Sequence, residues 1–246
     1  MADGLVQLRK KCILATAEAL KKAVTTDQLI IQMTDATHEL HKVTNTLAKR
    51  LREWFGGWIP ELEKAVNDHA TLAHLVATKK YKELLAEAHV KESVGTAIDK
   101  KEEKAIQEFA QTLNAMYEEK ARLLEHTERL LKEIMPNTLA LCGASIAADL
   151  LSSAGSFKRF SQLPSGTVQL LGAETALFRH LQNKKHRPPK HGLIFNHQLV
   201  QRVRRDQRGK AARGLADKIS LTIKVDRFKG EPCGEEMRKK LEARFS

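Results

Sequence analysis

Apolar residues recur at helical spacing along the first part of the chain. The clearest pattern advances in steps of 4, 3, 4, 3, 4, 4 and 3 residues, a near-heptad stripe typical of a coiled-coil helix. Its members are Leu29, Met33, Ala36, Leu40, Val43, Leu47, Leu51 and Trp54. The stripe predicts one helix from Asp27 to Phe55, about 43 Å long at 1.5 Å per residue. Thr25 and Gln28 have capping-box spacing at its start, and Gly56-Gly57 end it.

A second long helix is predicted from Ala97 to Met135, where Pro136 closes it. Its stripe comprises Ile106, Phe109, Leu113, Met116, Tyr117, Ala121, Leu124, Glu128, Leu131 and Met135. Residues 61–92 between the two stripes have broken periodicity, which indicates a cap of short helices. Neither stripe can be left in water, so an antiparallel coiled coil is the expected arrangement. The pattern of residues 5–24 predicts a surface helix that packs on a longer element of the fold.

Pro136 also marks a change in composition, from which we predict a domain boundary. Residues 1–135 form a helical coiled-coil domain and residues 136–246 a compact domain of short helices. Helices are expected over 139–151, 156–163, 206–225 and 235–245, and turns over 152–156 and 164–166. The inner face of the third of these helices is Ala212, Leu215, Ala216, Ile219 and Ile223. Ala, Leu, Glu and Lys are abundant and aromatic residues make up only 5% of the chain, so the fold class is all-α.

Positive charge gathers in one stretch of the chain. The formal net charge is +12, and residues 175–213 hold eleven basic residues against one acid, Asp206, which gives 11 − 1 = +10. Pro188-Pro189 predict an exposed loop over 183–191 within this stretch. Such clustering favours a polyanionic partner, nucleic acid above all. A solvated basic face without a partner is the plainer alternative.

No pattern for catalysis is present. The sequence lacks GxSxG, a P-loop and a dinucleotide-binding glycine motif. His38 and His41 are three residues apart, unlike the zincin pair, and the three cysteines suggest neither a disulfide framework nor a zinc site. We therefore expect no enzyme, metal or cofactor. No run approaches the roughly 20 apolar residues of a membrane span, and no signal peptide is evident, so an intracellular protein is expected.

The basic stretch has the residue types of an RNA-binding surface. Lys and Arg beside helix starts suit phosphates. Phe178, Phe195, His191 and His197 can stack on unpaired bases. For each of the two phenylalanines taken singly, packing in the core is the more common role.

Three motifs in this region resemble the Nop domain of box C/D ribonucleoprotein core proteins. They are GAETALFRHL, PPKHGLIFNHQLV and QRGKAARGLADKISLTIKVDRF, while DQLIIQMTDATHELHKVTNTLAKRLREWFGGWIPEL resembles the coiled-coil segment of the family. The resemblance covers Thr25 to Phe228. It implies an all-α scaffold that recognises a kink-turn RNA together with a small ribosomal-type protein already bound to it. It also implies homodimerisation through the coiled coil, and a location that is cytoplasmic if archaeal and nuclear or nucleolar if eukaryotic.

The chain departs from the family in two places. Members carry an α/β domain ahead of the coiled coil that holds fibrillarin, the separate methyltransferase that performs RNA 2′-O-methylation. Only about 25 residues stand there in this sequence, so fibrillarin binding by this polypeptide is in doubt. Eukaryotic members place a base-contacting histidine directly after the aromatic residue of the GLIF-like motif. Asn196 occupies that place here and His197 follows, so both are candidates.

The resemblance implies a set of site residues. The RNA- or protein-binding residues are Glu174, Phe178, Arg179, Lys184, Lys190, His191, Asn196, His197, Arg208, Lys210 and Arg213. The coiled-coil and dimer residues are Met33, Leu40, Leu47, Leu113 and Leu124. The alternative function is a paralogue that acts as a protein-interaction or other assembly module without fibrillarin.

Overall fold

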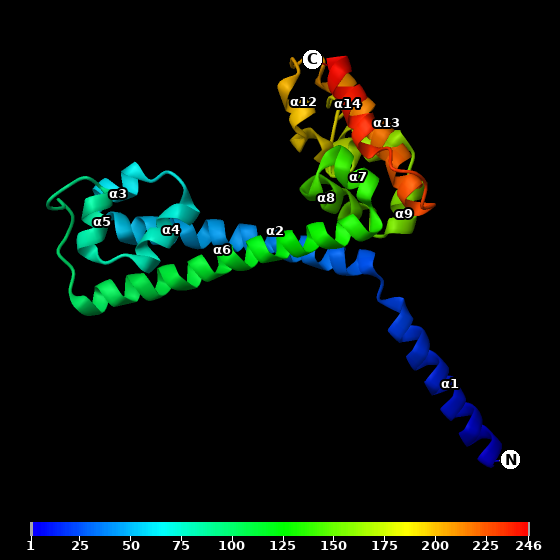
Figure 1. The fold of residues 1–246 in the computed structure, drawn as a ribbon, viewed down its shortest axis with the longest axis horizontal. Coiled ribbons are helices and arrows are strands. Elements are labelled where there is room, and N and C mark those ends of the chain that lie inside the picture. Colours follow the sequence, from blue (N-terminus) through cyan, green and yellow to red (C-terminus); the bar gives the residue numbers. More distant parts are fainter. Residues whose placement is uncertain (1, 246) are drawn as a thin grey trace. The chain divides into compact units, whose positions relative to one another are not determined.

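The computed structural model describes residues 2–245, and all their side chains except those of residues 2, 3, 22 and 23. Within that range it holds fourteen α-helices, one 3-10 helix and no strand (Figure 1). The expectation of an all-α fold is confirmed. The chain divides into two compact units, a coiled-coil unit, Asp35–Glu125, and a second unit, Met1–Thr34 with His126–Ser246, which we call the terminal unit.

Two long helices dominate the chain, as the apolar stripes predict. Helix α2 spans Thr26–Gly56 and α6 spans Lys100–Ile134, and they run antiparallel. Between them lie three short helices, α3 (Pro60–Ala65), α4 (His69–Thr78) and α5 (Tyr81–Glu87), which form the predicted cap. The core of the coiled-coil unit joins side chains of α2 and α6 to those of all three short helices.

The buried stripe of α2 lies one residue later than the pattern predicts for most of its length. Its members are Ile30, Thr34, Thr37, Thr44, Ala48, Leu51 and Phe55. Of the predicted stripe, only Leu51 is buried, while Met33, Leu40 and Leu47 are half-buried and Leu29, Val43 and Trp54 are exposed. The reason is that threonine can be buried in a helix at little cost. The hydroxyls of Thr34 and Thr44 donate to carbonyls four residues earlier at 2.7 Å, so neither is left unsatisfied.

The stripe of α6 follows its prediction more closely. Ile106, Leu113, Leu131 and Met135 are buried. Leu124, however, is 42% exposed, and Thr127 is buried in this part of the helix. A buried threonine again stands where an apolar residue was expected, although here the Thr127 hydroxyl has no hydrogen-bond partner in the described part of the chain.

The terminal unit is built around α13 (Arg208–Arg227). Five other helices pack against it: α7 (Pro136–Cys142), α9 (Phe157–Gln162), α10 (Ser165–Leu170), α12 (Gln198–Arg202) and α14 (Gly234–Phe245). The predicted inner face of α13 is confirmed, since all five of its residues are buried. The single helix expected over 139–151 is two, α7 and α8 (Ala144–Ala154), divided at Gly143, whose φ is 82°. The turn predicted at 164–166 instead begins α10.

Helix α1 (Ala2–Ala23) differs from its prediction in its packing. Every side chain described in it is exposed, including Leu5 at 69% and Leu14 at 65%. The expected packing against a longer element is therefore absent from the described part of the chain. Neither α1 nor any other described helix has the length and apolar character needed to cross a bilayer.

Candidate nucleic-acid interface

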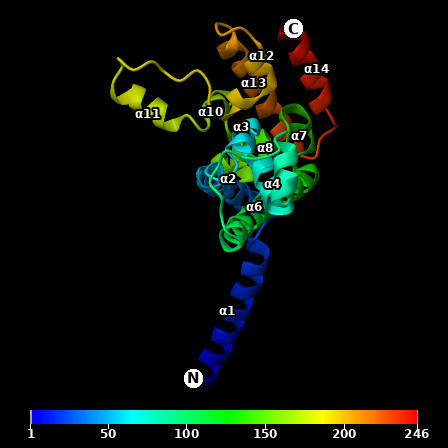
Figure 2. The same ribbon diagram turned by 90° about the vertical axis from the view of Figure 1, so that its left-hand side faces the viewer.

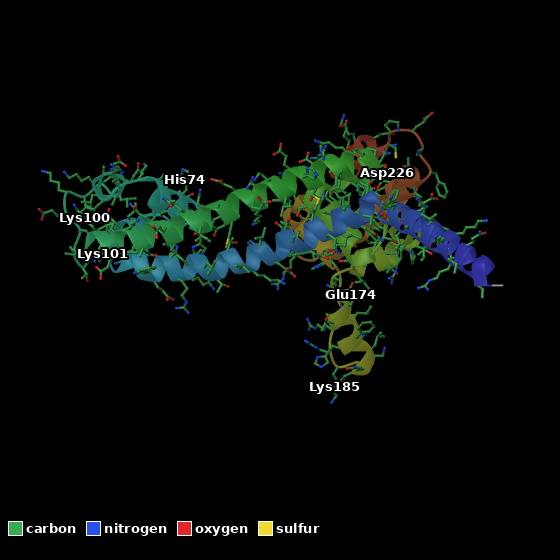
Figure 3. All side chains as sticks on the ribbon, turned by 90° about the horizontal axis from the view of Figure 1, so that it is seen from below. His74, Lys100, Lys101, Glu174, Lys185 and Asp226 are labelled. Atoms are coloured by element: carbon green, nitrogen blue, oxygen red, sulfur yellow. The ribbon has the colours of Figure 1, made fainter. Side chains whose placement is uncertain are left out.

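The basic stretch begins with a helix that stands away from the rest of its unit. Helix α11 (Glu174–Gln182) and the loop after it project from the neighbouring helices (Figure 2). The helix has no buried residue, and Phe178 is 59% exposed. Arg179 and Lys184 are exposed as well. Figure 3 shows Glu174 and Lys185 within this projection.

The turn at Gly172 sets the point at which α11 leaves the domain. Gly172 has φ 81°, in the left-handed region that favours glycine, and an added Cβ would lie 2.5 Å from Cγ of Leu193. The Glu174 carboxylate accepts a hydrogen bond from the Gly172 backbone amide at 2.7 Å. Glu174 therefore shapes the turn, and the exposed side chains of α11 are left to make contacts.

At the other end of the loop, two rings and a guanidinium form a cluster. The rings of His191 and Phe195 are stacked, with centroids 4.5 Å apart and planes 14° apart. The Arg208 guanidinium lies over the Phe195 ring, 5.5 Å from its centroid, in a cation–π contact. Arg208 also donates from Nη2 to the Gln201 carbonyl at 3.3 Å, while its Nε is buried without a partner in the described chain. We call His191, Phe195 and Arg208 the ring cluster.

Burial holds the His191 imidazole in its neutral form. Partial burial lowers the pKa of His191, and the positive charges of Arg208 and Lys190 lower it further, while a backbone hydrogen bond opposes them. At neutral pH the ring is therefore uncharged and suited to stacking. The loop that carries it is anchored, because the Gln169 side-chain amide donates to the Lys190 carbonyl at 2.6 Å.

The backbone on both sides of Gly192 is pinned to α10. Its amide donates to the Gln169 carbonyl at 2.9 Å, and the Leu193 amide donates to the Leu171 carbonyl at 2.7 Å. A Cβ at Gly192 would lie only 1.9 Å from the Leu171 oxygen. Only glycine permits this approach, which places the ring cluster at the start of η1 (Leu193–Asn196).

Asn196 and His197 have different environments. Asn196 is exposed at the end of η1. The His197 ring is half-buried, and its Nδ1 accepts from the Leu199 amide at 3.1 Å, capping α12. Burial lowers the pKa of His197, although a hydrogen bond to the Leu141 backbone opposes the shift. The His197 imidazole thus already has partners on α12 and α7, whereas Asn196 faces solvent.

The predicted site residues therefore fall into separate groups. The projection carries Glu174, Phe178, Arg179 and Lys184. The ring cluster includes His191 and Arg208, with Lys190 beside it, and Lys210 and Arg213 are exposed on α13. Asn196 and His197 line a groove. This groove, of about 800 Å³, was not foreseen. Arg202, Arg238 and Glu242 belong to its wall, together with the first turn of α8.

The comparisons with known proteins agree on one family. The family model described as "Nop: snoRNA binding domain, fibrillarin" matches residues 36–246. An uncharacterised NOP5 family protein of Methanocaldococcus jannaschii is 36% identical over 260 residues, covering 97% of this chain and 62% of the relative. The probable nucleolar protein 5-2 of Arabidopsis thaliana is 38% identical over 238 residues, covering 89% of this chain and 44% of the relative.

A further relative and a solved structure extend the comparison. Nucleolar protein 56 of Bos taurus is 32% identical over 243 residues, covering 89% of this chain and 41% of the relative. The chain thus spans less than two thirds of each of these three relatives. A crystal structure titled as a fibrillarin/Nop5p complex has the same fold, with a TM-score of 0.59 and 23% identity over 100% of this chain and 81% of that one. With the family model matching most of its length, the chain belongs to the Nop family.

Proposed function

We propose that this protein is a non-enzymatic RNA-binding scaffold of a box C/D-type ribonucleoprotein, a particle that guides RNA 2′-O-methylation. In this function it recognises a kink-turn RNA together with the small ribosomal-type protein bound to it. The observation that carries the proposal is the ring cluster, placed at the base of a projection within a stretch of net charge +10. Family membership and the nucleolar names of the relatives support it.

The ring cluster has the chemistry that a folded RNA requires. A neutral imidazole on a phenyl ring offers a stacking surface for an unpaired base. The Arg208 Nε is a buried donor without a partner in the described chain, and a phosphate or base oxygen would complete its hydrogen bonding. Lys190 lies beside the cluster and adds a positive charge that suits the phosphates of the RNA backbone. We assign base contact on the η1 side to Asn196 rather than His197, because the His197 ring is already bonded within the domain.

We assign the small protein to the groove between α8, α12 and α14. Its wall includes both signs of charge, Arg202 and Arg238 against Glu242, and the apolar ring of Phe245. Mixed charge with apolar area fits a protein surface better than a phosphate backbone, which would select for cations alone.

We also propose that the protein forms a homodimer through the coiled coil. The apolar residues that α2 leaves uncovered supply the surface: Leu29 at 47% and Val43 at 46% exposed, with Met33, Leu40 and Leu47 half-buried beside them. Leu124 on α6 is also exposed, at 42%, whereas Leu113 is buried and stabilises the unit itself. Light scattering should report a dimer for the wild type and a monomer for Val43→Glu. A wild-type monomer at micromolar concentration would rule the dimer out.

We also propose two functional domains, a coiled-coil domain of residues 1–135 and an RNA-binding Nop domain of residues 136–246. The doubt about fibrillarin has no support from the comparisons, so fibrillarin stays among the candidate partners. Co-purification of a methyltransferase with the protein from native extract tests it directly. Sequencing of the RNA recovered in the same experiment identifies the particle.

A salt titration with a matched charge reversal tests RNA recognition. If the protein neutralises about six phosphates, log affinity should fall against log salt with a slope of about −5. Arg208→Glu should weaken binding to kink-turn RNA carrying its small protein and flatten the slope. Arg122→Glu is the control, since its charge change is the same and its side chain is 70% exposed on α6. A slope near zero, or equal losses in both variants, would contradict the proposal.

The alternative is a protein-interaction or other assembly module that works without fibrillarin. One observation favours it, the exposed apolar side chains along α1. In that case the protein should fail to bind kink-turn RNA both with and without the small protein. Binding that depends on Arg208 excludes this reading.

A further inference from the structure

The outer face of α13 carries one continuous line of exposed side chains. These residues follow one another at steps of three or four: Lys210, Arg213, Asp217, Leu221, Lys224 and Phe228. Residues at that spacing lie on one face of a helix. The opposite face is the buried inner face of α13, so this line points away from the core. From Lys210 to Phe228 it runs for about 27 Å, at 1.5 Å per residue.

The line ends at an aromatic ring held in solvent. Phe228 is 82% exposed, the most exposed aromatic side chain among the large apolar residues in the described part of the chain. Leu221, two turns earlier on the same face, is 46% exposed. Leaving a large apolar side chain in water gains the domain nothing, so a ring kept there is a candidate for contact with another molecule.

The backbone beneath Phe228 is ordered by specific contacts. The Phe228 amide donates to the Lys224 carbonyl at 3.0 Å and the Gly230 amide to the Val225 carbonyl at 2.9 Å. Lys229 between them has φ 52°. The side chain of Asp226, two residues earlier, is bonded to the start of α7 at 2.7–2.9 Å. The ring therefore stands on a fixed helix end and not on a loose loop.

Three cations are close neighbours of Phe228 along the chain. Lys224 lies one turn before Phe228, and Arg227 and Lys229 flank it in sequence, all three exposed. The Arg227 guanidinium is held 5.5 Å from the centroid of the Phe157 ring. A groove of about 490 Å³ opens beside this contact. Phe157, Arg227 and Lys229 line it, together with the exposed acid Glu133. An aromatic face among lysine and arginine side chains is the arrangement that binds unpaired nucleotides.

We propose that the RNA-contacting surface continues from Lys210 along the outer face of α13 and ends at Phe228, which stacks on an unpaired base. The inference rests on the proposed function, because it extends the same surface by the length of one helix. Lys210, Arg213 and Lys224 follow the phosphates of the strand. Figure 3 labels Lys185 in the projection and the buried Asp226, two residues before Phe228, and the two lie apart in that view.

The test compares three RNA probes by filter binding. They are a kink-turn RNA carrying its small protein, the same RNA extended by an unpaired oligouridine tail, and the tail alone. Phe228→Ala should weaken binding of the tailed RNA by roughly 5- to 150-fold, the loss typical of one base stack, and leave binding of the untailed RNA unchanged. Phe228→Trp should retain binding. Phe228→Leu should lose it, because leucine keeps the apolar bulk without a ring.

The outcomes separate this inference from the proposed function. If the tail adds no affinity and Phe228→Ala changes nothing, while the kink-turn RNA still binds, the inference is overturned and the proposed function stands. If the kink-turn RNA does not bind but the tail alone does, and Phe228→Ala abolishes this, only the proposed function fails. If Phe228→Leu binds the tailed RNA as the wild type does, the contact is apolar and not a stack, which overturns the inference. The melting temperature should not change in any variant, because the side chain is exposed.

Discussion

The carboxylate of Asp226 accepts hydrogen bonds from the backbone amide and the side-chain amide of Asn137, both at 2.9 Å. It also accepts from the Thr138 amide at 2.9 Å and the Thr138 hydroxyl at 2.7 Å. The Asn137 side-chain oxygen in turn accepts from the Cys233 amide at 2.6 Å and the Gly234 amide at 3.1 Å. One buried acid near the end of α13 thereby satisfies the free amides that begin α7, and Asn137 passes the connection on to α14.

Loss of this carboxylate should destabilise the terminal unit. Asp226→Ala leaves the amides of Asn137 and Thr138 buried and unpaired, which we expect to cost about 3 kcal/mol or more of unfolding free energy. Urea unfolding followed by far-UV circular dichroism measures the loss. Asp217→Ala is the matched control, since Asp217 is exposed on the same helix and its removal should cost less than about 0.5 kcal/mol. Equal midpoints for the two variants would contradict the assignment.

In the coiled-coil unit, Arg52 fixes the short helices to α2. Its Nε donates to His69 Nδ1 at 2.8 Å, and its Nη1 donates to the Glu63 carboxylate at 2.7 Å and the Glu63 carbonyl at 3.1 Å. Nη2 donates to the Val66 carbonyl. The side chain is only 17% exposed, so these bonds are shielded from solvent.

Arg52→Ala should therefore lower the stability of the coiled-coil unit by about 2–3 kcal/mol, because partly buried acceptors lose a charged donor. Both tryptophans of the chain, Trp54 and Trp58, lie in this unit, so fluorescence during urea unfolding reports on it. Arg50→Ala is the control. Arg50 pairs with Glu53 at 2.5 Å, but its side chain is 71% exposed, and such pairs contribute less than about 1 kcal/mol. A loss for Arg50→Ala as large as that for Arg52→Ala would refute this role.

The close approach at Gly192 should make the ring cluster sensitive to a single methyl group. Gly192→Ala forces the added Cβ, at 1.9 Å from the Leu171 oxygen, to push η1 off α10. We expect a loss of about 1–3 kcal/mol or more in stability, together with weaker RNA binding, because His191 and Phe195 move with the backbone. Gly166→Ala is the control, since nothing lies within 4 Å of a Cβ there. Unchanged melting temperature and RNA affinity for Gly192→Ala would show that the backbone can yield.

The sequence predicts the helices better than it predicts their faces. Helical period, prolines and paired glycines place α2, α6 and α13 to within a few residues of their observed ends. The faces of α2 are misjudged because Thr34 and Thr44 bury hydroxyls that are satisfied by their own helix, which no hydrophobicity pattern records. Similarly, the division at Gly143 depends on a backbone angle and not on apolar spacing.

The candidate site shows the same limit. Charge density alone locates the projection, and the family motifs lead to His191, Asn196 and Arg208. The stacking partner Phe195, judged more consistent with a core residue, packs against the core and stacks on His191 as well. The anchoring role of Asp226 was not predictable, because its partners on α7 lie 88 and 89 residues away in sequence.

The two histidines near the interface should make the terminal unit sensitive to mild acid. Burial lowers the folded-state pKa of both His197 and His191 below the ordinary value of 6.5, so the unfolded chain binds protons first as pH falls. Stability should therefore be full above pH 6.5 and decline below it, before the carboxylates with lowered pKa, such as Asp27, begin to titrate. Chemical unfolding at pH 7.5 and 5.5 measures the difference. His197→Asn should reduce it, because the deeper of the two rings is gone. His74→Asn is the control, because His74 belongs to the coiled-coil unit and not to the terminal unit. If the pH dependence is identical in the wild type and His197→Asn, protonation of His197 does not lower the stability of the folded state, which contradicts the prediction.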